Sequence, residues 1–252
     1  MRLIYFTVGH DKHYLTLLAM CIESLRKYGR YTQDIHVFIP KDEYYEKSIS
    51  DIDKTISVSF YEGDSRTNSS ASKLLIFKKD LRKYEKVLFL DCDILVVRNI
   101  DAVFNAIGDK IAVSSECLNG KLMTISLWGG LFLNDKEKEV VIRDKVYGVN
   151  AGVFGFRPTE ENLLVFEEMH HLAKNSTLSD SFLEQPVFNY ILFKTRQYER
   201  SFQSLILHRD PDIRESLSGD IILIHFLGEK NPRVKIRRMK PVFPIISNLV
   251  QN

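Results

Sequence analysis

The stretch KVLFLDCDILVVR, residues 86–98, decides how this chain folds, because two carboxylates interrupt an otherwise apolar run. Residues 87–90 are continuously apolar, which is typical of a central parallel strand covered on both faces. Asp91 and Asp93 follow where that strand should end. Ligands of open α/β sheets bind at the carboxyl ends of the strands. We therefore expect the two carboxylates to lie at a binding site.

A divalent cation is the natural partner of this acidic pair. Each carboxylate removed from water costs several kcal/mol unless a cation compensates its charge. Oxygen ligands of this kind suit Mg²⁺ or Mn²⁺, which commonly bridge one or two carboxylates to the phosphates of a substrate. The alternative is that Asp91 and Asp93 are solvated turn residues or cap a helix, and a lone DxD pattern does not decide between the two.

Strands and helices alternate along the chain. Apolar runs bounded by turn residues predict strands at residues 3–8, 35–39, 57–61, 111–114, 152–156 and 221–224. Helical spacing of apolar residues predicts helices at 15–28, 72–84, 160–174 and 185–193. This alternation predicts an α/β fold with a Rossmann-like, mostly parallel central sheet and helices on both faces. No internal repeat or Pro/Gly-rich linker marks a boundary, so one domain over residues 1–252 is expected.

The composition excludes several classes of protein. Lys and Arg number 35 against 33 Asp and Glu, so the chain as a whole is not built to bind a polyanion, and no nucleic-acid partner is expected. Cys21, Cys92 and Cys117 are an odd number without CxxC spacing, which indicates neither a disulfide framework nor a zinc site. Neither a signal peptide nor a membrane span is evident, and the expected location is the cytoplasm.

A histidine near the far end of the chain is a further candidate ligand. His225 directly follows the strand expected at 221–224, a position where a histidine is more often a packed core or turn residue. Its neighbours favour a ligand-binding role. Gly228 lets the backbone approach a ligand closely, Lys230 can pair with phosphate, and a turn is expected at residues 231–232.

Taken in order, these segments resemble the glycogenin-like branch of the retaining glycosyltransferases, glycosyltransferase family 8, which have the GT-A fold. The resemblance covers about residues 3–232. It is carried by a first βα turn with Asp11 and Tyr14, Lys73 before the metal strand, LFLDCDILV at 88–96 with NID at 99–101, NAGVF at 150–154, EQ at 184–185 and HFLG at 225–228.

The resemblance implies a role for each of these residues. Asp91, Asp93 and His225 are the implied ligands of Mn²⁺, or of Mg²⁺, against the diphosphate of a UDP-sugar. The implied donor-binding residues are Thr7, Val8, Asp11, Tyr14 and Cys92 toward the nucleotide, Lys73, Gly228 and Lys230 toward phosphates or sugar hydroxyls, and Asn150, Ala151 and Gly152 along the sugar. Gln185, Glu184 and Lys73 are the residues we expect to take part in catalysis.

The same resemblance implies transfer of a hexose, with glucose and galactose ahead of others, to a separate hydroxyl acceptor on a glycan, a protein or a small molecule. No tyrosine follows Tyr198, so an acceptor tail like that of glycogenin is missing. The implied nucleotide-binding half is about residues 1–100 and the sugar and acceptor half about 101–232, followed by a basic segment at 233–252. A homodimer is left open.

Two departures from the family pattern affect the site. Glu184-Gln185 stands where family members usually have Asp-Gln, which leaves the choice of hexose open. Lys230 lies one residue before the usual position of the phosphate-binding lysine, which Asn231 occupies here.

The basic run RVKIRRMK at 233–240 is expected to be a solvated face, with a phosphate, membrane-surface or partner contact as the alternative.

Three alternative functions remain at this stage. A haloacid-dehalogenase-type phosphatase also places DxD after an apolar strand, but normally near the N-terminus. A nucleotidyltransferase should carry a Gly-rich phosphate loop, which residues 7–10, TVGH, do not provide. An inactive sugar-nucleotide-binding protein would share every binding residue and differ only in turnover.

Overall fold

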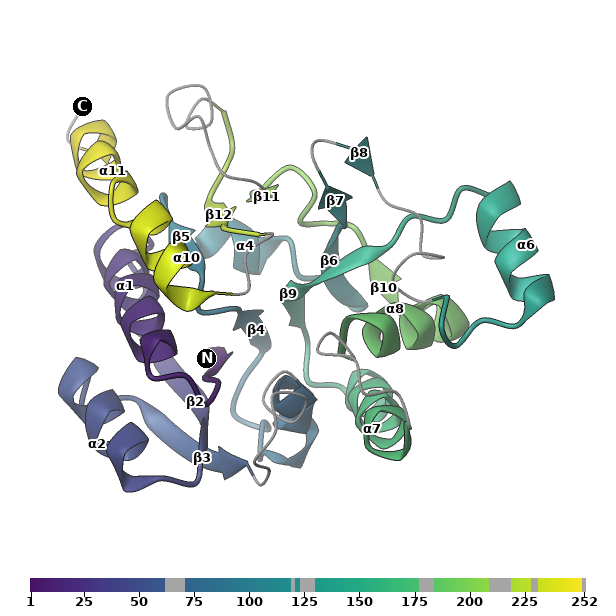
Figure 1. Ribbon diagram of the computed structural model, residues 1–252, viewed down its shortest axis with the longest axis horizontal. Helices are drawn as coiled ribbons and strands as arrows, with labels where there is room; N and C mark the ends of the chain where they lie inside the picture. Colours follow the sequence, from purple (N-terminus) through teal and green to yellow (C-terminus); the bar gives the residue numbers. More distant parts are fainter. Residues whose placement is uncertain are drawn as a thin grey trace.

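The computed structural model describes residues 1–61, 71–118, 121–122, 130–176, 184–208, 219–227 and 231–250 (Figure 1). Within these residues the main sheet has seven strands in the order β10-β6-β9-β4-β1-β2-β3. Its strands are β1 (Arg2–Thr7), β2 (Asp34–Pro40), β3 (Ser57–Tyr61), β4 (Lys86–Leu90), β6 (Ile111–Ser115), β9 (Val149–Phe156) and β10 (Tyr198–Glu199). The neighbouring pairs are parallel except those of β9, which confirms a mostly parallel sheet.

The reversed direction of β9 places its first residues beside the end of β4. Leu90 at the end of β4 pairs with Val153 in the antiparallel register. Residues 150–152 therefore extend past β4 alongside the acidic pair, and the Asp91 N–H donates to the Gly152 carbonyl at 2.8 Å. The strand begins earlier than the expected residue 152, because the amide of Asn189 bonds both the N–H and the carbonyl of Val149 and so fixes the backbone there.

A second sheet brings the distant histidine to the same place. It consists of β11 (Ile206–His208), β12 (Leu223–His225) and β5 (Ile94–Val96), and β5 follows the acidic pair directly in sequence. The antiparallel β5–β12 pair aligns His225 with Ile94. His225 thus ends β12 rather than following it, and its register puts it next to Asp93. A further two-stranded sheet joins β7 (Cys117–Leu118) and β8 (Lys121–Leu122).

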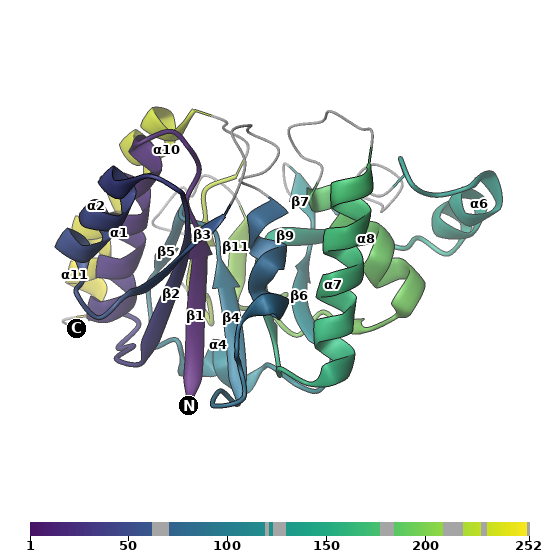
Figure 2. The same ribbon diagram turned by 90° about the horizontal axis from the view of Figure 1, so that it is seen from below.

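Helices cover both faces of the main sheet (Figure 2). The helices are α1 (His13–Lys27), α2 (Glu43–Ile52), α4 (Asp101–Asn105), α6 (Asp135–Arg143), α7 (Glu160–Asn175), α8 (Glu184–Thr195), α10 (Pro232–Met239) and α11 (Val242–Val250). One apolar core contains side chains of α1, α10 and α11, and the other contains side chains of α7 and α8. The strands between them are buried on both sides, as the continuous apolar run in β4 predicts.

The helix expected at residues 72–84 is shorter and has a different geometry. The structure has a 3-10 helix, η1, at Ser72–Lys78. The carboxylate of Asp80 accepts the backbone N–H of Arg82 at 3.2 Å, and this local bond favours a turn over a continued helix. The apolar pattern did not predict the helices α2, α4, α6, α10 and α11 or the short strands β5, β7, β8, β10 and β11. Asp42 caps α2 by accepting the N–H of Tyr44.

Cys21 and Cys92 are buried and are free thiols in the described part of the structure.

Of the helices in the described part of the chain, none combines the length and apolar character that crossing a bilayer requires.

A buried histidine in β2 should make the fold sensitive to acid. Burial, and to a lesser extent the charge of Lys79, lowers the pKa of His36 to about 3, below its ordinary value of 6.5. The unfolded chain therefore takes up a proton below about pH 6.5 that the folded chain does not, so stability is fully present above that pH and is lost as the pH falls. Between about pH 6.5 and pH 5, the free energy of unfolding should fall by about 2 kcal/mol more in the wild type than in His36→Gln.

Urea denaturation at several pH values measures this difference. His171→Gln is the matched control, because that side chain is exposed in the folded protein. Parallel pH curves for the wild type and His36→Gln would contradict the assignment of the acid sensitivity to His36.

Candidate metal and nucleotide site

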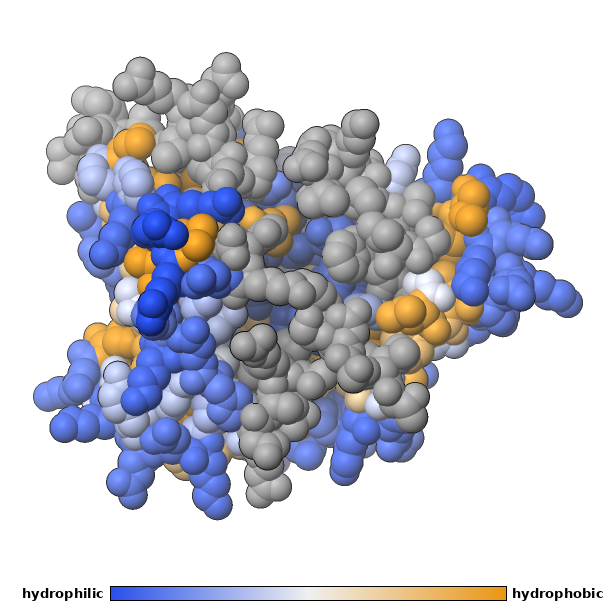
Figure 3. All heavy atoms as spheres, viewed as in Figure 1, coloured by the Kyte–Doolittle hydropathy of each residue, from blue (hydrophilic) through white to orange (hydrophobic). Residues whose placement is uncertain are grey.

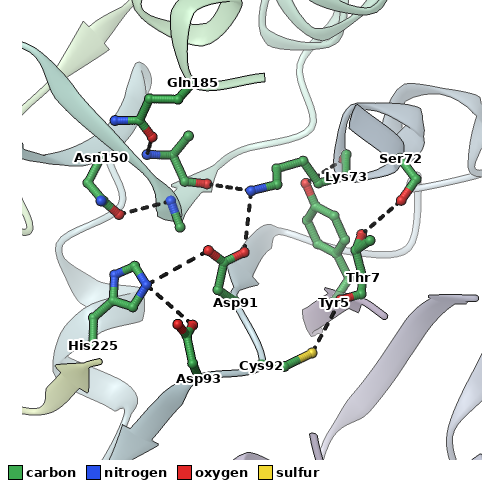
Figure 4. A network of polar contacts seen from close by, with 12 residues as sticks. Tyr5, Thr7, Ser72, Lys73, Asp91, Cys92, Asp93, Asn150, Gln185 and His225 are labelled. Atoms are coloured by element: carbon green, nitrogen blue, oxygen red, sulfur yellow. Dashed lines mark hydrogen bonds and ion pairs between the residues drawn. The ribbon is translucent and has the colours of Figure 1, made fainter. Parts of the chain in front are cut away.

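Two carboxylates and an imidazole converge at the carboxyl end of β4 (Figure 4). One ligand atom each from Asp91, Asp93 and His225 lies within 4.8 Å of the others. His225 Nε2 lies 3.3 Å from Asp93 Oδ1 and 3.8 Å from Asp91 Oδ2. Oxygen and imidazole donors together suit Mn²⁺ and also Mg²⁺. The donor set therefore fits the divalent cation that the acidic pattern predicts.

The surrounding backbone holds these three side chains close together. Asp93 accepts the N–H of Phe226 through its carbonyl at 3.1 Å, which ties β12 to the acidic loop. Gly152 faces the cluster with no side chain of its own. A Cβ at this position would lie 2.3 Å from His225 Cε1 and 2.6 Å from Asp91 Oδ2, so only glycine leaves room for the cluster.

Lys73 supplies a buried positive charge beside the cluster. Its ammonium lies 3.3 Å from Asp91 Oδ1, donates to the Ala151 carbonyl at 3.1 Å and lies 4.7 Å from the centre of the Phe89 ring. The side chain is only 4% exposed, so the charge acts in surroundings where water screens it little. The Tyr5 hydroxyl donates to the carbonyl of Lys73 and helps to hold η1 against the sheet.

A second lysine, which the sequence pattern did not single out, pairs with Asp93. Lys235 of α10 directs its ammonium at Asp93 Oδ2, while Asp93 Oδ1 faces His225. Burial alone would raise the pKa of Asp93, but the Lys235 charge and then His225 hold that pKa well below its ordinary value. This carboxylate is therefore ionised over the whole physiological pH range. The expectation that residues 233–240 form only a solvated face is wrong at Lys235.

A network of amides and a buried carboxylate forms the wall of the site along β9. Glu116 Oε2 accepts from Asn150 Nδ2 at 2.8 Å and from Gln185 Nε2 at 2.9 Å. Gln185 Oε1 accepts the N–H of Ala151, and Asn150 Oδ1 accepts the N–H of Gly152. Burial raises the pKa of Glu116, and the two amide hydrogen bonds oppose that rise. Glu116 could not be identified from the sequence, because it follows β6 without any motif around it.

The expected nucleotide loop lies beside the same edge of the sheet. The Cys92 thiol contacts the Thr7 carbonyl at 3.2 Å, and Tyr61 donates to the Val8 carbonyl at 2.8 Å. Asp11 is exposed and accepts from both the backbone and the ring of His13. Burial raises the pKa of Tyr14; the charge of Lys235 opposes this rise, and the charges of Asp93, Cys92 and Asp91 add to it, so Tyr14 shares the electrostatic environment of the cluster.

Three expected residues need separate mention. Gly228 and Lys230 lie outside the described residues. Glu184 is the first residue of α8 and is half-buried next to Gln185.

One further histidine lies near the cluster. His208 begins the sequence HRD at residues 208–210, which is a chance match to a kinase motif. It is hydrogen-bonded to Ser114 at 2.6 Å, and its ring centre is 5.5 Å from that of His225.

Comparisons with known proteins agree with this arrangement. The family model described as glycosyl transferase family 8 matches residues 6–232. The solved structure of the galactosyltransferase LgtC with donor and acceptor sugar analogues is similar, with a TM-score of 0.59 at 12% identity over 96% of each chain. GlyE of Streptococcus pneumoniae TIGR4 gives a TM-score of 0.62 at 14% identity, over 98% of this chain and 63% of GlyE.

The bifunctional glycosyltransferase WbbM is also similar, with a TM-score of 0.62 at 16% identity over 95% of this chain. This chain spans about half of WbbM, covering 49% of its length. A search of curated proteins gives no match.

The mostly parallel sheet and the similar solved structures show the GT-A fold. The family model covers most of the sequence, and the chain belongs to glycosyl transferase family 8. The family resemblance and the fold class predicted from the sequence are thereby confirmed, and membership of this family supports a retaining glycosyltransferase.

The missing side chain at Gly152 gives a direct test of the cluster. Gly152→Ala should weaken Mn²⁺ binding by at least about tenfold, because the added methyl displaces His225 or Asp91. Isothermal titration calorimetry with Mn²⁺ measures the effect. Gly155→Ala is the control on the same strand. There a Cβ would meet Ile107 Cδ1 at 2.5 Å, so stability should fall while Mn²⁺ binding persists. Equal Mn²⁺ affinity in Gly152→Ala and the wild type would refute this placement of the ligands.

Proposed function

We propose that this protein is a metal-dependent hexosyltransferase that moves a hexose from a UDP-sugar to a separate hydroxyl acceptor with retention of configuration. The single observation that supports this most is the convergence of Asp91, Asp93 and His225 at the carboxyl end of β4. Ligands of this type of sheet bind at that edge. Asp91, Asp93 and His225 would hold Mn²⁺, or Mg²⁺, and the bound cation would neutralise charge on the departing diphosphate.

Lys73 would add to the same electrostatic stabilisation. Its ammonium is fixed by Asp91 and by the Ala151 carbonyl before any substrate binds. A charge that is already in place needs little reorganisation during the reaction, which is the condition under which electrostatic stabilisation is most effective. Thr7, Val8, Asp11, Tyr14 and Cys92 would line the nucleotide side, and Gly228 and Lys230 the diphosphate.

The wall along β9 suits the sugar. Asn150, Ala151 and Gly152 present amide and backbone groups there, and Gln185 makes hydrogen bonds to Ala151, Glu116 and Val149 that fix its orientation. An amide is a poor nucleophile. We therefore favour same-face transfer, in which the acceptor attacks beside the departing phosphate and a phosphate oxygen takes its proton. Gln185 and Glu184 would position the sugar and stabilise the developing positive charge.

Glucose and galactose are the hexoses we place first. Galactose is favoured by the likeness to LgtC, whose structure contains donor and acceptor sugar analogues. The phosphatase and nucleotidyltransferase alternatives receive no support from the family match, which covers residues 6–232. Measured turnover distinguishes an enzyme from the remaining alternative, an inactive sugar-nucleotide-binding protein.

A panel of UDP-sugars with Mn²⁺ tests the proposal. We expect UDP release from UDP-glucose or UDP-galactose in the presence of a hydroxyl acceptor, and loss of at least about a hundredfold in rate for Asp93→Asn and for His225→Ala. Both residues lie at strand ends, so circular dichroism should show a retained fold. Wild-type turnover in either variant at saturating Mn²⁺ would remove that residue from the metal site.

The same incubations yield two controls. UDP binding that depends on Mn²⁺ without any turnover would identify a binding protein instead of an enzyme. The intact mass of the chain after incubation shows whether the protein itself is the acceptor, and added hexoses on the chain would contradict a separate acceptor.

Gln185→Ala should separate catalysis from nucleotide binding. The side chain lies along β9, so its loss should lower the transfer rate by about tenfold to a thousandfold while UDP affinity stays nearly unchanged. Steady-state kinetics and UDP titration measure the two quantities. Asn189→Ala is the control, because Asn189 bonds the same Val149 carbonyl from within the core, and it should cost stability rather than turnover. A parallel loss of UDP affinity in Gln185→Ala would contradict the assignment to the sugar side.

A further inference from the structure

Lys235 is the one cation of α10 that the described part of the structure brings to the metal cluster. The helix carries four cationic residues, and Arg233 and Arg237 are exposed, in keeping with the strongly hydrophilic surface over α10 in Figure 3. Lys235 differs from them because its side chain is only 15% exposed and its ammonium is paired with Asp93. The Asp93 side chain is 5% exposed, so this ion pair is largely shielded from water.

The two oxygens of Asp93 face different partners. Oδ1 lies 3.3 Å from His225 Nε2, on the side of the candidate metal ligands, and Oδ2 is paired with Lys235. A divalent cation held by Asp91, Asp93 and His225 would therefore share one carboxylate with an ammonium group. Positive charges that share a buried carboxylate repel strongly, since little water screens them.

We propose that Lys235 competes with the divalent metal for Asp93 and thereby makes metal binding depend on the donor. This inference rests on the proposed function of the site. Without a second anion, each metal ion must bind against the charge of Lys235, so the metal binds weakly. When a nucleoside diphosphate binds together with the metal, its phosphate oxygens give the Lys235 ammonium another anionic partner, and the repulsion is offset.

The position of α10 supports this coupling. Arg233 Nε contacts His13 Nε2 at 3.0 Å, and His13 in turn pairs with Asp11 of the first loop. The helix therefore touches both the metal cluster, through Lys235, and the expected nucleotide loop, through Arg233. When Lys235 changes its partner, the change therefore occurs on a helix that already contacts the loop where the nucleotide is expected.

The test compares Mn²⁺ binding with and without UDP in four proteins: the wild type, Lys235→Gln, Lys235→Met and Arg237→Met. Isothermal titration calorimetry measures each affinity, and no turnover is needed. Lys235→Gln retains a hydrogen-bond donor for Asp93, so it gives a result even if Lys235→Met, which leaves Asp93 Oδ2 without its partner, does not fold. Arg237→Met removes a charge from the exposed face of the same helix and is the matched control.

We expect Lys235→Gln to bind Mn²⁺ alone about tenfold more tightly than the wild type, because the competing charge is gone. The factor by which UDP strengthens Mn²⁺ binding should fall by a similar amount, because the charge that UDP offsets in the wild type is absent. The factor by which Mn²⁺ strengthens UDP binding should fall equally, since the coupling is reciprocal. Lys235→Met should show the same changes if it folds, and Arg237→Met should behave like the wild type. Equal or weaker Mn²⁺ affinity in Lys235→Gln would overturn the proposal, and so would an unchanged coupling factor.

Failure of this inference can be told from failure of the proposed function. If the wild type binds neither Mn²⁺ nor UDP, the proposed function fails. If the wild type binds both cooperatively and Lys235→Gln does so to the same extent, the function stands and the role of Lys235 is refuted. If Arg237→Met matches Lys235→Gln, the effect belongs to the overall charge of α10, and the specific role of Lys235 is also refuted.

Discussion

The burial of negative charge at the end of β4 is the constraint on which the rest of the site depends. Asp93 is almost fully buried, and burial alone would raise the pKa of its carboxyl group. It stays ionised because Lys235 and His225 are brought to it, and Asp91 forms an ion pair with Lys73. Each of these partners comes from a different element. The small sheet, η1 and α10 are therefore held in place partly by the charges they neutralise.

Much of this fold could be predicted from the order of strands and helices alone. The apolar run before Asp91 identifies a central strand, because a strand covered on both faces has no polar side to show. The same reasoning placed Asp91 and Asp93 at the end of this strand and His225 just after another strand, and the structure brings the three together with His225 as the last residue of β12. The acidic pair itself indicated a divalent cation, whereas the family resemblance supplied the expected nucleotide and sugar, neither of which follows from spacing.

The elements that escaped prediction did so for different physical reasons. β5 is a strand of three residues, too short to show a period, and its pairing with β12 is fixed by the register at Ile94 and His225. α10 begins with Asn231 and Pro232, a pair that suits the first positions of a helix as well as a turn. Because Lys235 is one of several basic residues in this segment, the sequence does not show that it points inward. Glu116 was missed because a buried carboxylate that only accepts bonds from amides leaves no pattern in the sequence.

The split of the site between the two sheets has a consequence for how the protein is made. Every strand of the main sheet lies before residue 200, whereas His225 and Lys235 come later in the chain. During synthesis, the N-terminal part emerges first and can begin to pack while these two residues are still inside the ribosome. The acidic pair gains its imidazole and its ammonium partner only after residues 225 and 235 have been synthesised. Only a chain completed as far as α10 therefore holds all of the charged groups of the cluster.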